Sequence, residues 1–318
     1  MSFRAPDRHT SMITTREEQA EFIARAEPYR RELHVHCYRM LGSFDEAEDQ
    51  VQETFLRAWR ARDSFQGRST FRAWMYRIAT NTCLDALARR PLPQSAADIP
   101  WLQPYPDAQL PSEDEPDAVV VARETIELAF LAAVQLVPPR QRAVLILRDV
   151  LDWPAKDAAE LLETSVASVN SALQRARATL RENLPEGRHE WPADRSPHED
   201  ALVRRYVEAS ERADVAALAA MLAEDARFSM PPEPGLYVGR DVIHAAWVEG
   251  GFGSEAFRDF RCLVTAANRQ PAVATYVREP GTDTYRPLAI DLLRIEGGQI
   301  AEIVAFPISP AFGLPPAL

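Results

Sequence analysis

Apolar residues between positions 44 and 58 recur at the spacing of an amphipathic helix. Every third or fourth position is apolar, which gathers these side chains on one side of the helix. Ser43 and Glu46 have the S-x-x-E spacing of a capping box, which predicts that the helix begins directly after Ser43. A further helix is predicted to begin near Phe71, after the loop "DSFQGRST". The apolar positions of the first helix are Phe44, Ala47, Val51, Phe55 and Ala58.

Three shorter helices are predicted between residues 138 and 181. The stretch "PPRQRAVLILRDVLDW" has prolines at a plausible helix start, and "PAKDAAELLE" predicts a short second helix. Ser165 is a good N-cap for the third helix, in which apolar residues recur at i, i+4, i+7 and i+11. This arrangement is typical of a helix-turn-helix unit, whose last helix enters the major groove of DNA. The apolar stripe is Val169, Leu173, Ala176 and Leu180.

The opposite face of that third helix carries the residues predicted to contact DNA. It presents amides, hydroxyls and arginines and no acid, as a DNA-reading surface requires. An amphipathic helix with a solvated polar face is the alternative interpretation of the same pattern. The predicted contacts are Asn170, Ser171, Gln174, Arg175, Arg177 and Arg181.

Beyond residue 198 the pattern predicts an α+β domain. Two helices, a strand and a helix come first, followed by alternating or continuous apolar runs such as "TYRPLAIDLLRIEGGQIAEIVAF". Turn signals of the types Asn-Arg-Gln-Pro, Pro-Gly and Gly-Gly separate these runs. They indicate an antiparallel curved sheet.

Proline content divides the chain. Seven prolines lie between Pro91 and Pro116, a composition that cannot sustain a helix or a central strand and that predicts an extended linker. The stretch "LPEGRHEWPADRSPHED" forms a second break. We therefore expect a multidomain protein, with two all-α domains and one α+β domain. The predicted segments are a first helical domain at 17–91, an acidic linker at 92–123, the helix-turn-helix domain at 124–184 and the α+β domain at 198–312.

The net charge of −11 is unevenly distributed along the 318 residues. Residues 1–90 sum to +2, whereas residues 91–123 and 185–318 sum to −5 and −7. The acidic total therefore leaves the two helical domains free to bind an anion such as DNA. Apolar stretches are too short for a membrane span, and the N-terminus lacks the apolar core of a signal peptide. We expect a cytoplasmic protein with no membrane association.

Cysteine and histidine spacing predicts neither a disulfide framework nor a metal site. The three cysteines, Cys37, Cys83 and Cys262, lie far apart and form no C-x-x-C motif. The cluster "HVHC" at 34–37 lies on a predicted helix and would need further ligands from elsewhere in the chain. We expect no metal and no cofactor.

Two long segments resemble the bacterial extracytoplasmic-function sigma factors. "LVPPRQRAVLILRDVLDWPAKDAAELLETSVASVNSALQRARATL" is similar to the promoter-binding fourth domain of that family, through its proline–arginine entry, its "AAELLETS" turn and its "RAR" exit. "SFDEAEDQVQETFLRAWRARDSFQGRSTFRAWMYRIATNTCLDALARR" resembles the second domain nearly end to end. The two lie in the family's order and are joined by a linker of fitting length. The resemblance implies a non-enzymatic sigma factor that binds RNA polymerase core and recognises and melts promoter DNA.

The resemblance also implies roles for residues of the first domain. An acidic ridge on the helix after Ser43 would dock on the clamp coiled coil of RNA polymerase, although a solvated charged face is the alternative. The ridge is Asp45, Glu48, Asp49, Gln52 and Glu53. The following loop and helix would bind the minus-ten element and hold a flipped base, because aromatic rings stack on bases and guanidinium groups hold phosphates. These residues are Phe65, Arg68, Arg72, Arg77 and Asn81.

The linker resembles the segment that threads the RNA-exit path of the polymerase in sigma factors. A disordered spacer is the alternative interpretation. The helix-turn-helix domain would bind the polymerase flap and the minus-thirty-five element. The expected partners are thus RNA polymerase core and promoter DNA.

The C-terminal domain resembles the SnoaL-like α+β cone, fused to sigma domains as a regulator in cis. Cyclases of that kind use a histidine and an aspartate, and His244, Asp225, Asp241 and Asp291 offer such groups. Fold similarity alone does not establish catalysis, so we expect no enzyme. A small-molecule ligand is expected in a pocket that includes Met230, His244, Trp247 and Tyr276. The alternative function is a SnoaL-like enzyme or ligand receptor with DNA-binding domains attached.

Overall fold

The computed structural model of the chain describes residues 8–67, 69–95, 99–111, 126–184, 196–255 and 257–318. It divides into two compact units, each built from segments that are discontinuous along the chain. The first unit comprises Met1–Pro91, Pro111–Val120 and Pro138–Ala176, and the second comprises Leu92–Leu110, Val121–Val137 and Arg177–Leu318. The described part of the predicted linker thus belongs to the same unit as the C-terminal domain.

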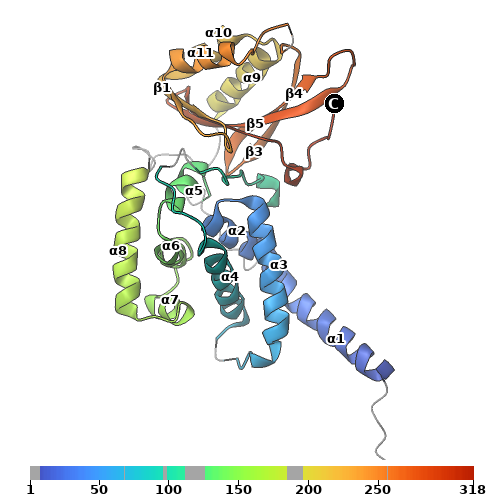
Figure 1. Ribbon diagram of the computed structural model, residues 1–318, viewed down its shortest axis with the longest axis vertical. Helices are drawn as coiled ribbons and strands as arrows, with labels where there is room; N and C mark the ends of the chain where they lie inside the picture. Colours follow the sequence, from blue (N-terminus) through green and yellow to red (C-terminus); the bar gives the residue numbers. More distant parts are fainter. Residues whose placement is uncertain (1–7, 68, 96–98, 112–125, 185–195, 256) are drawn as a thin grey trace, which may run out of the picture. The chain divides into compact units, whose positions relative to one another are not determined.

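The N-terminal part of the first unit is helical, as predicted (Figure 1). Its core is formed by α2, α3 and α4, and α2 ends at Gly42, whose φ of 76° is the left-handed conformation that terminates helices. The Ser43 hydroxyl accepts a hydrogen bond from the Glu46 amide at 3.3 Å, so the predicted N-cap forms. The reciprocal half of the predicted capping box is wrong, because the Glu46 carboxylate pairs with Arg90 instead. The elements are α1 (Arg8–Ala26), η1 (Glu27–Tyr29), α2 (Arg30–Leu41), α3 (Phe44–Ala61), η2 (Arg62–Ser64) and α4 (Phe71–Leu87).

The apolar stripe of α3 is largely buried. Four of the five predicted positions are inaccessible or nearly so, and Phe55 is half-buried. Thr54 is also fully buried, which its polarity did not suggest. Its hydroxyl donates to the Gln50 carbonyl at 2.6 Å and lies 3.3 Å from the Thr82 hydroxyl on α4, so the polar group is satisfied inside the core.

The helix-turn-helix elements follow the predicted order. Pro138 and Pro139 open α6, and Glu163, with φ of 51°, forms the tight turn before the last helix. The Ser165 hydroxyl accepts from the Ser168 amide at 3.1 Å, which is the N-cap bond predicted for it. Val169, Leu173 and Ala176 are buried and Leu180 is half-buried. The elements are α6 (Pro139–Leu145), the π-helical turn η5 (Ile146–Val150), α7 (Ala155–Leu161) and α8 (Val166–Asn183).

The C-terminal domain consists of three helices and a six-stranded sheet with the order β2-β1-β6-β5-β4-β3. Strands β3 to β6 pair antiparallel, as predicted, because tight turns join them. Strand β1 pairs parallel to β6, which makes the sheet mixed. Periodicity along a chain does not reveal the direction in which distant strands pair, so the sequence did not predict this. The elements are α9 (Pro197–Glu211), α10 (Val215–Ala220), β1 (Leu222–Ser229), β2 (Tyr237–Val238), α11 (Arg240–Glu249), β3 (Phe260–Ala267), β4 (Gln270–Arg278), β5 (Tyr285–Glu296) and β6 (Gln299–Phe306).

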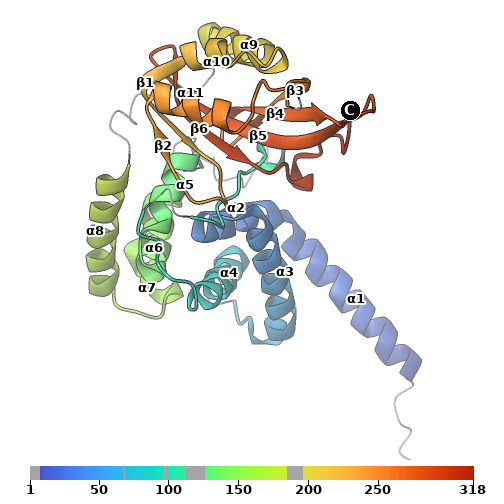
Figure 2. The same cartoon turned by 45° about the horizontal axis from the view of Figure 1, so that its top comes forward.

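Helices α9, α10 and α11 lie over one face of this sheet (Figures 1 and 2). One apolar core joins Leu202 and Tyr206 of α9 and Ile243 of α11 to strand residues such as Val273 and Ile303. Residues of β4 are buried on both faces of the sheet. The Tyr276 hydroxyl donates to the Pro315 carbonyl at 2.8 Å, so the C-terminal segment after η7 (Pro310–Phe312) covers part of the second face.

Short segments of the linker region complete the second unit. They are η3 (Asp107–Gln109) and α5 (Leu128–Gln135). Ile99, Leu102, Tyr105 and Leu110 are each at most 5% exposed, so this part of the chain is packed rather than solvated. A disordered spacer, the alternative interpretation of the sequence, does not describe these residues.

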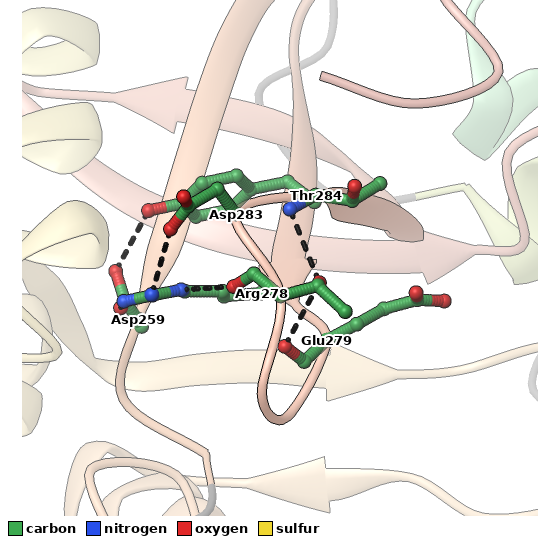
Figure 3. A network of polar contacts seen from close by, with 7 residues as sticks. Asp259, Arg278, Glu279, Asp283 and Thr284 are labelled. Atoms are coloured by element: carbon green, nitrogen blue, oxygen red, sulfur yellow. Dashed lines mark hydrogen bonds and ion pairs between the residues drawn. The ribbon is translucent and has the colours of Figure 1, made fainter.

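An exposed polar network closes the hairpin between β4 and β5 (Figure 3). Arg278 donates to Asp259 at 3.0 Å and to Asp283 at 2.9 Å, and the Tyr285 hydroxyl donates to Asp259 at 2.9 Å. These hydrogen bonds lower the pKa of Asp259. Exposed pairs of this kind contribute little to stability, so the network fixes local geometry and carries no assigned function. In the part of the chain that the structure describes, no helix is long and apolar enough to cross a membrane.

Candidate nucleic-acid interface and regulatory domain

The six predicted DNA contacts of the helix-turn-helix all lie on exposed positions of α8. The buried stripe of Val169, Leu173 and Ala176 orients the helix, so its opposite face is presented outward. Gln174 and Arg175 lie at the middle of the helix, and Arg181 lies in its last turn. The geometry provides a surface of amide and guanidinium donors of the kind that reads the major groove.

The predicted minus-ten residues lie in two different settings. Asn81 is exposed on α4, with its amide accessible to a ligand. Phe65 is half-buried, with its ring centroid 5.6 Å from that of Phe71 and 5.3 Å from that of Trp74. Part of the Phe65 ring therefore supports the loop, which leaves only its remaining surface for stacking on a base. Arg68 lies outside the described residues.

The two arginines of the predicted minus-ten surface are engaged by carboxylates. Arg72 makes hydrogen bonds of 3.0 and 2.9 Å to the two carboxylate oxygens of Glu32, which also accepts from the Tyr76 hydroxyl at 3.1 Å. This arrangement favours a role for Arg72 in holding α4 against α2 rather than in contacting DNA. Arg77 pairs with Glu163, in the turn of the helix-turn-helix.

The helix-turn-helix packs against the N-terminal helices within the first unit. Arg142 of α6 is 2% exposed and donates to the Met40 carbonyl at the end of α2. Burial lowers the pKa of Arg142 to about 9. The Trp153 and Tyr76 rings lie 5.4 Å apart, which adds an aromatic contact between α4 and the segment before α7. Sequence analysis did not identify these contacts, because nothing in either helical pattern shows which helix packs on which.

A groove of about 500 Å³ lies between α4 and α7. It is lined by Trp74 and Arg77 on one side and by Asp157 and Glu160 on the other. Acidic side chains therefore face the surface that was predicted to bind DNA. In this arrangement of the first unit, α7 occupies part of the space that a promoter strand would need.

The predicted acidic ridge of α3 is on the surface. Asp45, Asp49 and Gln52 are exposed, while Glu48 and Glu53 are half-buried. Glu53 is paired with Arg57 at 2.7 Å, and Glu48 accepts from Gln52 at 3.3 Å. The ridge thus keeps its acidic character with part of it balanced internally.

The "HVHC" residues form part of the first unit's core. The His36 ring nitrogen lies 2.9 Å from the Thr80 hydroxyl, and burial lowers the pKa of His36 to about 3. Burial also lowers the pKa of His34 to about 4. Both imidazoles are therefore neutral packing groups at neutral pH. Among the residues that the structure describes, no group of three metal-ligating side chains is assembled.

The turn between β3 and β4 holds the linker on the C-terminal domain. Asn268 is fully buried and has φ of 55°. Its side chain accepts from the Tyr105 amide at 2.8 Å and donates to the Ile126 carbonyl at 2.6 Å. The Asn268 amide in turn donates to the Tyr105 carbonyl at 2.9 Å. We call Asn268, Tyr105 and Ile126 the linker clasp.

Neighbouring contacts extend the linker clasp. The Arg269 amide donates to Asp107 at 2.8 Å, and the side chain of Gln109 donates to the Ala311 carbonyl at 2.6 Å. The Gln270 side chain accepts from the Leu128 amide at the start of α5, at 3.3 Å. One hairpin turn thus contacts the linker both before and after its undescribed residues. The sequence marked this turn but gave no sign of its partners.

The C-terminal domain encloses a cavity of about 550 Å³. Aromatic and aliphatic side chains from α11, β1 and the following loops form most of its wall, and Tyr206 and Asp291 supply polar atoms. The Tyr206 hydroxyl donates to the Asp291 carboxylate at 3.1 Å. Burial is the main cause that raises the pKa of Asp291 to about 6, although the hydrogen bond from Tyr206 acts in the opposite direction.

Two of the four predicted pocket residues line this cavity. Met230 and Trp247 do, whereas His244 and Tyr276 do not. Tyr276 follows Thr275, which lines the cavity, and successive strand residues face opposite sides of a sheet. On α11 the lining residues belong to its C-terminal part, one turn beyond His244. Of the four candidate acid–base groups, only Asp291 reaches the cavity, so the predicted histidine–aspartate pair is not assembled there.

Comparison with known proteins identifies three family domains. Residues 26–91 match the model of Sigma-70 region 2, residues 127–180 match Sigma-70 region 4, and residues 203–303 match the SnoaL-like domain. The order is the one that the sequence motifs indicated.

Two curated relatives and one solved structure agree with these matches. The chain is 41% identical to the ECF RNA polymerase sigma factor SigG of Mycobacterium tuberculosis, over 95% of this chain and 86% of that protein. It is 31% identical to the ECF RNA polymerase sigma factor SigW of Bacillus subtilis, over 52% of this chain and 90% of the relative. The fold is similar to the crystal structure of the Mycobacterium tuberculosis extracytoplasmic function sigma factor SigJ, with a TM-score of 0.59 at 23% identity, covering 92% of this chain and 98% of SigJ. Identity of this extent across nearly the whole chain shows that the protein belongs to the ECF RNA polymerase sigma factors.

Proposed function

We propose that this sigma factor binds RNA polymerase core in the cytoplasm, reads promoters through α8 and α4, and is controlled in cis by its C-terminal domain. The observation that carries the regulatory part is the linker clasp, in which the buried Asn268 side chain bonds to both ends of the linker. A linker held in this way is not free to enter a channel of the polymerase. The C-terminal domain acts here by binding and not by catalysis.

The first unit supports control by closure as well. The pairing of Arg77 with Glu163 and the acidic lining of the α4–α7 groove oppose DNA at the predicted minus-ten surface. The partly exposed ion pair contributes about 0–1 kcal/mol by itself. The buried Arg142 and the Tyr76–Trp153 contact are the stronger restraints on opening. We infer that polymerase and promoter bind a rearranged form, and that a small bias in free energy sets how often that form is populated.

Polymerase contacts are assigned to the acidic ridge of α3 for the clamp coiled coil and to the helix-turn-helix domain for the flap. Run-off transcription with purified core polymerase tests the whole assignment. Promoter-specific transcripts are expected only when both the core and this protein are present. A transcript pattern that is the same without the protein would contradict the assignment and leave the alternative of an enzyme or receptor with attached DNA-binding domains.

Substitutions on α8 are expected to separate sequence reading from phosphate binding. Gln174→Ala and Arg175→Ala should each weaken binding to the cognate upstream element by about 1–3 kcal/mol and relax its sequence preference, because amides and guanidinium groups read base edges. Arg177→Ala and Arg181→Ala should weaken binding to all sequences and reduce the salt dependence. Anisotropy titrations on cognate and scrambled duplexes at several salt concentrations measure both effects. Equal losses on the two duplexes for all four variants would overturn this division.

Asn81→Ala is expected to impair promoter melting without loss of polymerase binding. The exposed amide is assigned to the flipped base, and unpairing a base costs a few kcal/mol that such contacts offset. Permanganate footprinting should show a weaker bubble on duplex promoters, while binding to core polymerase stays unchanged. Ser69→Ala, at an exposed loop position, is the matched control. A full-strength bubble in the Asn81 variant would remove this residue from the assignment.

A further inference from the structure

Its lining gives the cavity of the C-terminal domain a definite chemical preference. Its volume of about 550 Å³ is within the range of sites for drug-sized molecules. Phe228, Trp247 and Phe252 form part of an apolar wall, and the Phe228 and Trp247 rings meet edge to face at 5.7 Å. Among the described residues that line it, two are acidic, Glu233 and Asp291, and none is basic.

Asp291 is placed where a ligand would meet it. It belongs to β5 in the run "LAIDLLRI", between residues that pack into the sheet, and it pairs across the sheet with Val273. Its printed hydrogen-bond partner is the Tyr206 hydroxyl, a neutral donor. Tyr206 is itself held by burial, with its pKa raised well above the usual value, so it stays protonated and donates. A buried carboxylate satisfied by one neutral hydroxyl is costly unless a cation or further donors reach it.

We propose that this cavity binds an apolar organic amine, whose protonated nitrogen pairs with the Asp291 carboxylate while its hydrocarbon part fills the aromatic wall. Carboxylate or phosphate ligands are disfavoured, because both charged side chains of the lining are acidic. The pKa of Asp291 near 6 leaves most of this group ionised at neutral pH, which suits a cationic ligand.

The inference rests on the proposed regulatory role, because it makes the amine an effector of the C-terminal domain. Strand β4 connects the two sites: Thr275 lines the cavity, and Asn268 of the linker clasp lies in the turn just before the strand begins. A ligand against β4 and β5 therefore has a short route to the turn that holds the linker.

Three probes of the same shape and different charge test the proposal on the full-length protein. They are pyrenylmethylamine, pyrenylmethanol and pyrenecarboxylic acid, titrated by calorimetry and by pyrene fluorescence. We expect the amine to bind at least tenfold more tightly than the alcohol, and the acid to bind most weakly. Equal affinities, a preference for the acid, or no binding by any probe would overturn the proposal.

Two variants locate the effect. Asp291→Asn keeps the volume and should abolish the preference for the amine, while the alcohol changes by less than threefold. Ala246→Phe narrows the cavity without touching the carboxylate and should weaken amine and alcohol alike. Asp241→Asn, an exposed position on α11 outside the lining, is the matched control and should bind as the unmodified protein does. Amine preference that survives Asp291→Asn would contradict the assignment.

Binding is measured without polymerase, which keeps the two proposals distinguishable. A failure of the probes to bind would remove the amine and leave control by the linker clasp untouched. Binding as expected, together with transcription that is insensitive to substitution of the clasp, would keep the site and contradict the regulatory role.

Discussion

Asn268→Gly will lower the free energy of unfolding of the C-terminal domain and release the linker from it. The substitution removes the bonds to the Tyr105 amide and the Ile126 carbonyl, and each buried group left unsatisfied costs about 1–3 kcal/mol. Glycine adopts the φ of 55° without strain, so the effect reports on the lost side chain and not on the turn. Urea unfolding should show a loss of roughly 2–5 kcal/mol for the two groups together.

Hydrogen exchange locates the same effect in the chain. Amides of residues 99–110 and 126–135 should exchange faster in the variant, while those of α2 to α4 stay protected. Arg269→Gly is the matched control: Arg269 also has positive φ, at 58°, and its contact with Asp107 uses the backbone amide, which glycine keeps. This control should stay within about 1 kcal/mol of the unmodified protein.

The consequence for transcription is an increase. A released linker is free to engage the polymerase, so run-off transcription by the Asn268→Gly variant should exceed that of the Arg269→Gly control. Faster exchange of the linker with unchanged transcription would show that the clasp is structural only. Unchanged exchange would show that other contacts hold the linker.

The helices of the DNA-binding domains were predictable because local rules decide them. Ser43 and Ser165 form the N-caps expected from their positions, and the buried stripes of α3 and α8 follow the helical period. The recognition surface of α8 then follows from geometry, since a helix with one buried stripe must present the opposite face. These features need no knowledge of the rest of the chain.

Contacts between distant segments escaped prediction. Arg77 and Glu163 are 86 positions apart, and Tyr105 and Asn268 are 163 positions apart. Proline content correctly excluded regular structure from the linker but could not show that Ile99 and Tyr105 are buried. Pairing of β1 with β6 has the same cause, because the partner of a strand is chosen by the whole fold.

The ligand pocket was predicted in kind and only partly in detail. Met230 and Trp247 line it, but Tyr276 faces the other side of the sheet, where its hydroxyl reaches Pro315. A register shift between β4 and β5 beside Thr275 makes alternation along the strand hard to follow from sequence. The informative signal was Asp291, a lone acid in an apolar strand, which lies in the cavity with Tyr206.

Asp291→Asn is expected to stabilise the protein at neutral pH. The carboxyl has an ordinary pKa of 3.8 and a folded-state pKa of about 6, so the folded state holds its proton more tightly than the unfolded state. Stability from this group is therefore complete below pH 4 and is lost as the pH rises from about 4 to 6. Two pKa units correspond to about 3 kcal/mol, which the asparagine variant does not lose.

Urea unfolding of both proteins across this pH range measures the effect. The difference in the free energy of unfolding should widen by about 2–3 kcal/mol between pH 4 and pH 7, in favour of Asp291→Asn. Asp241→Asn controls for the removal of a carboxylate from the surface. A difference that stays constant with pH would mean that Asp291 is not strained by burial, and the demand for a cation in the cavity would lose its physical reason. A widening difference, together with loss of amine preference in the same variant, would identify Asp291 as a group that destabilises the empty domain and stabilises its complex.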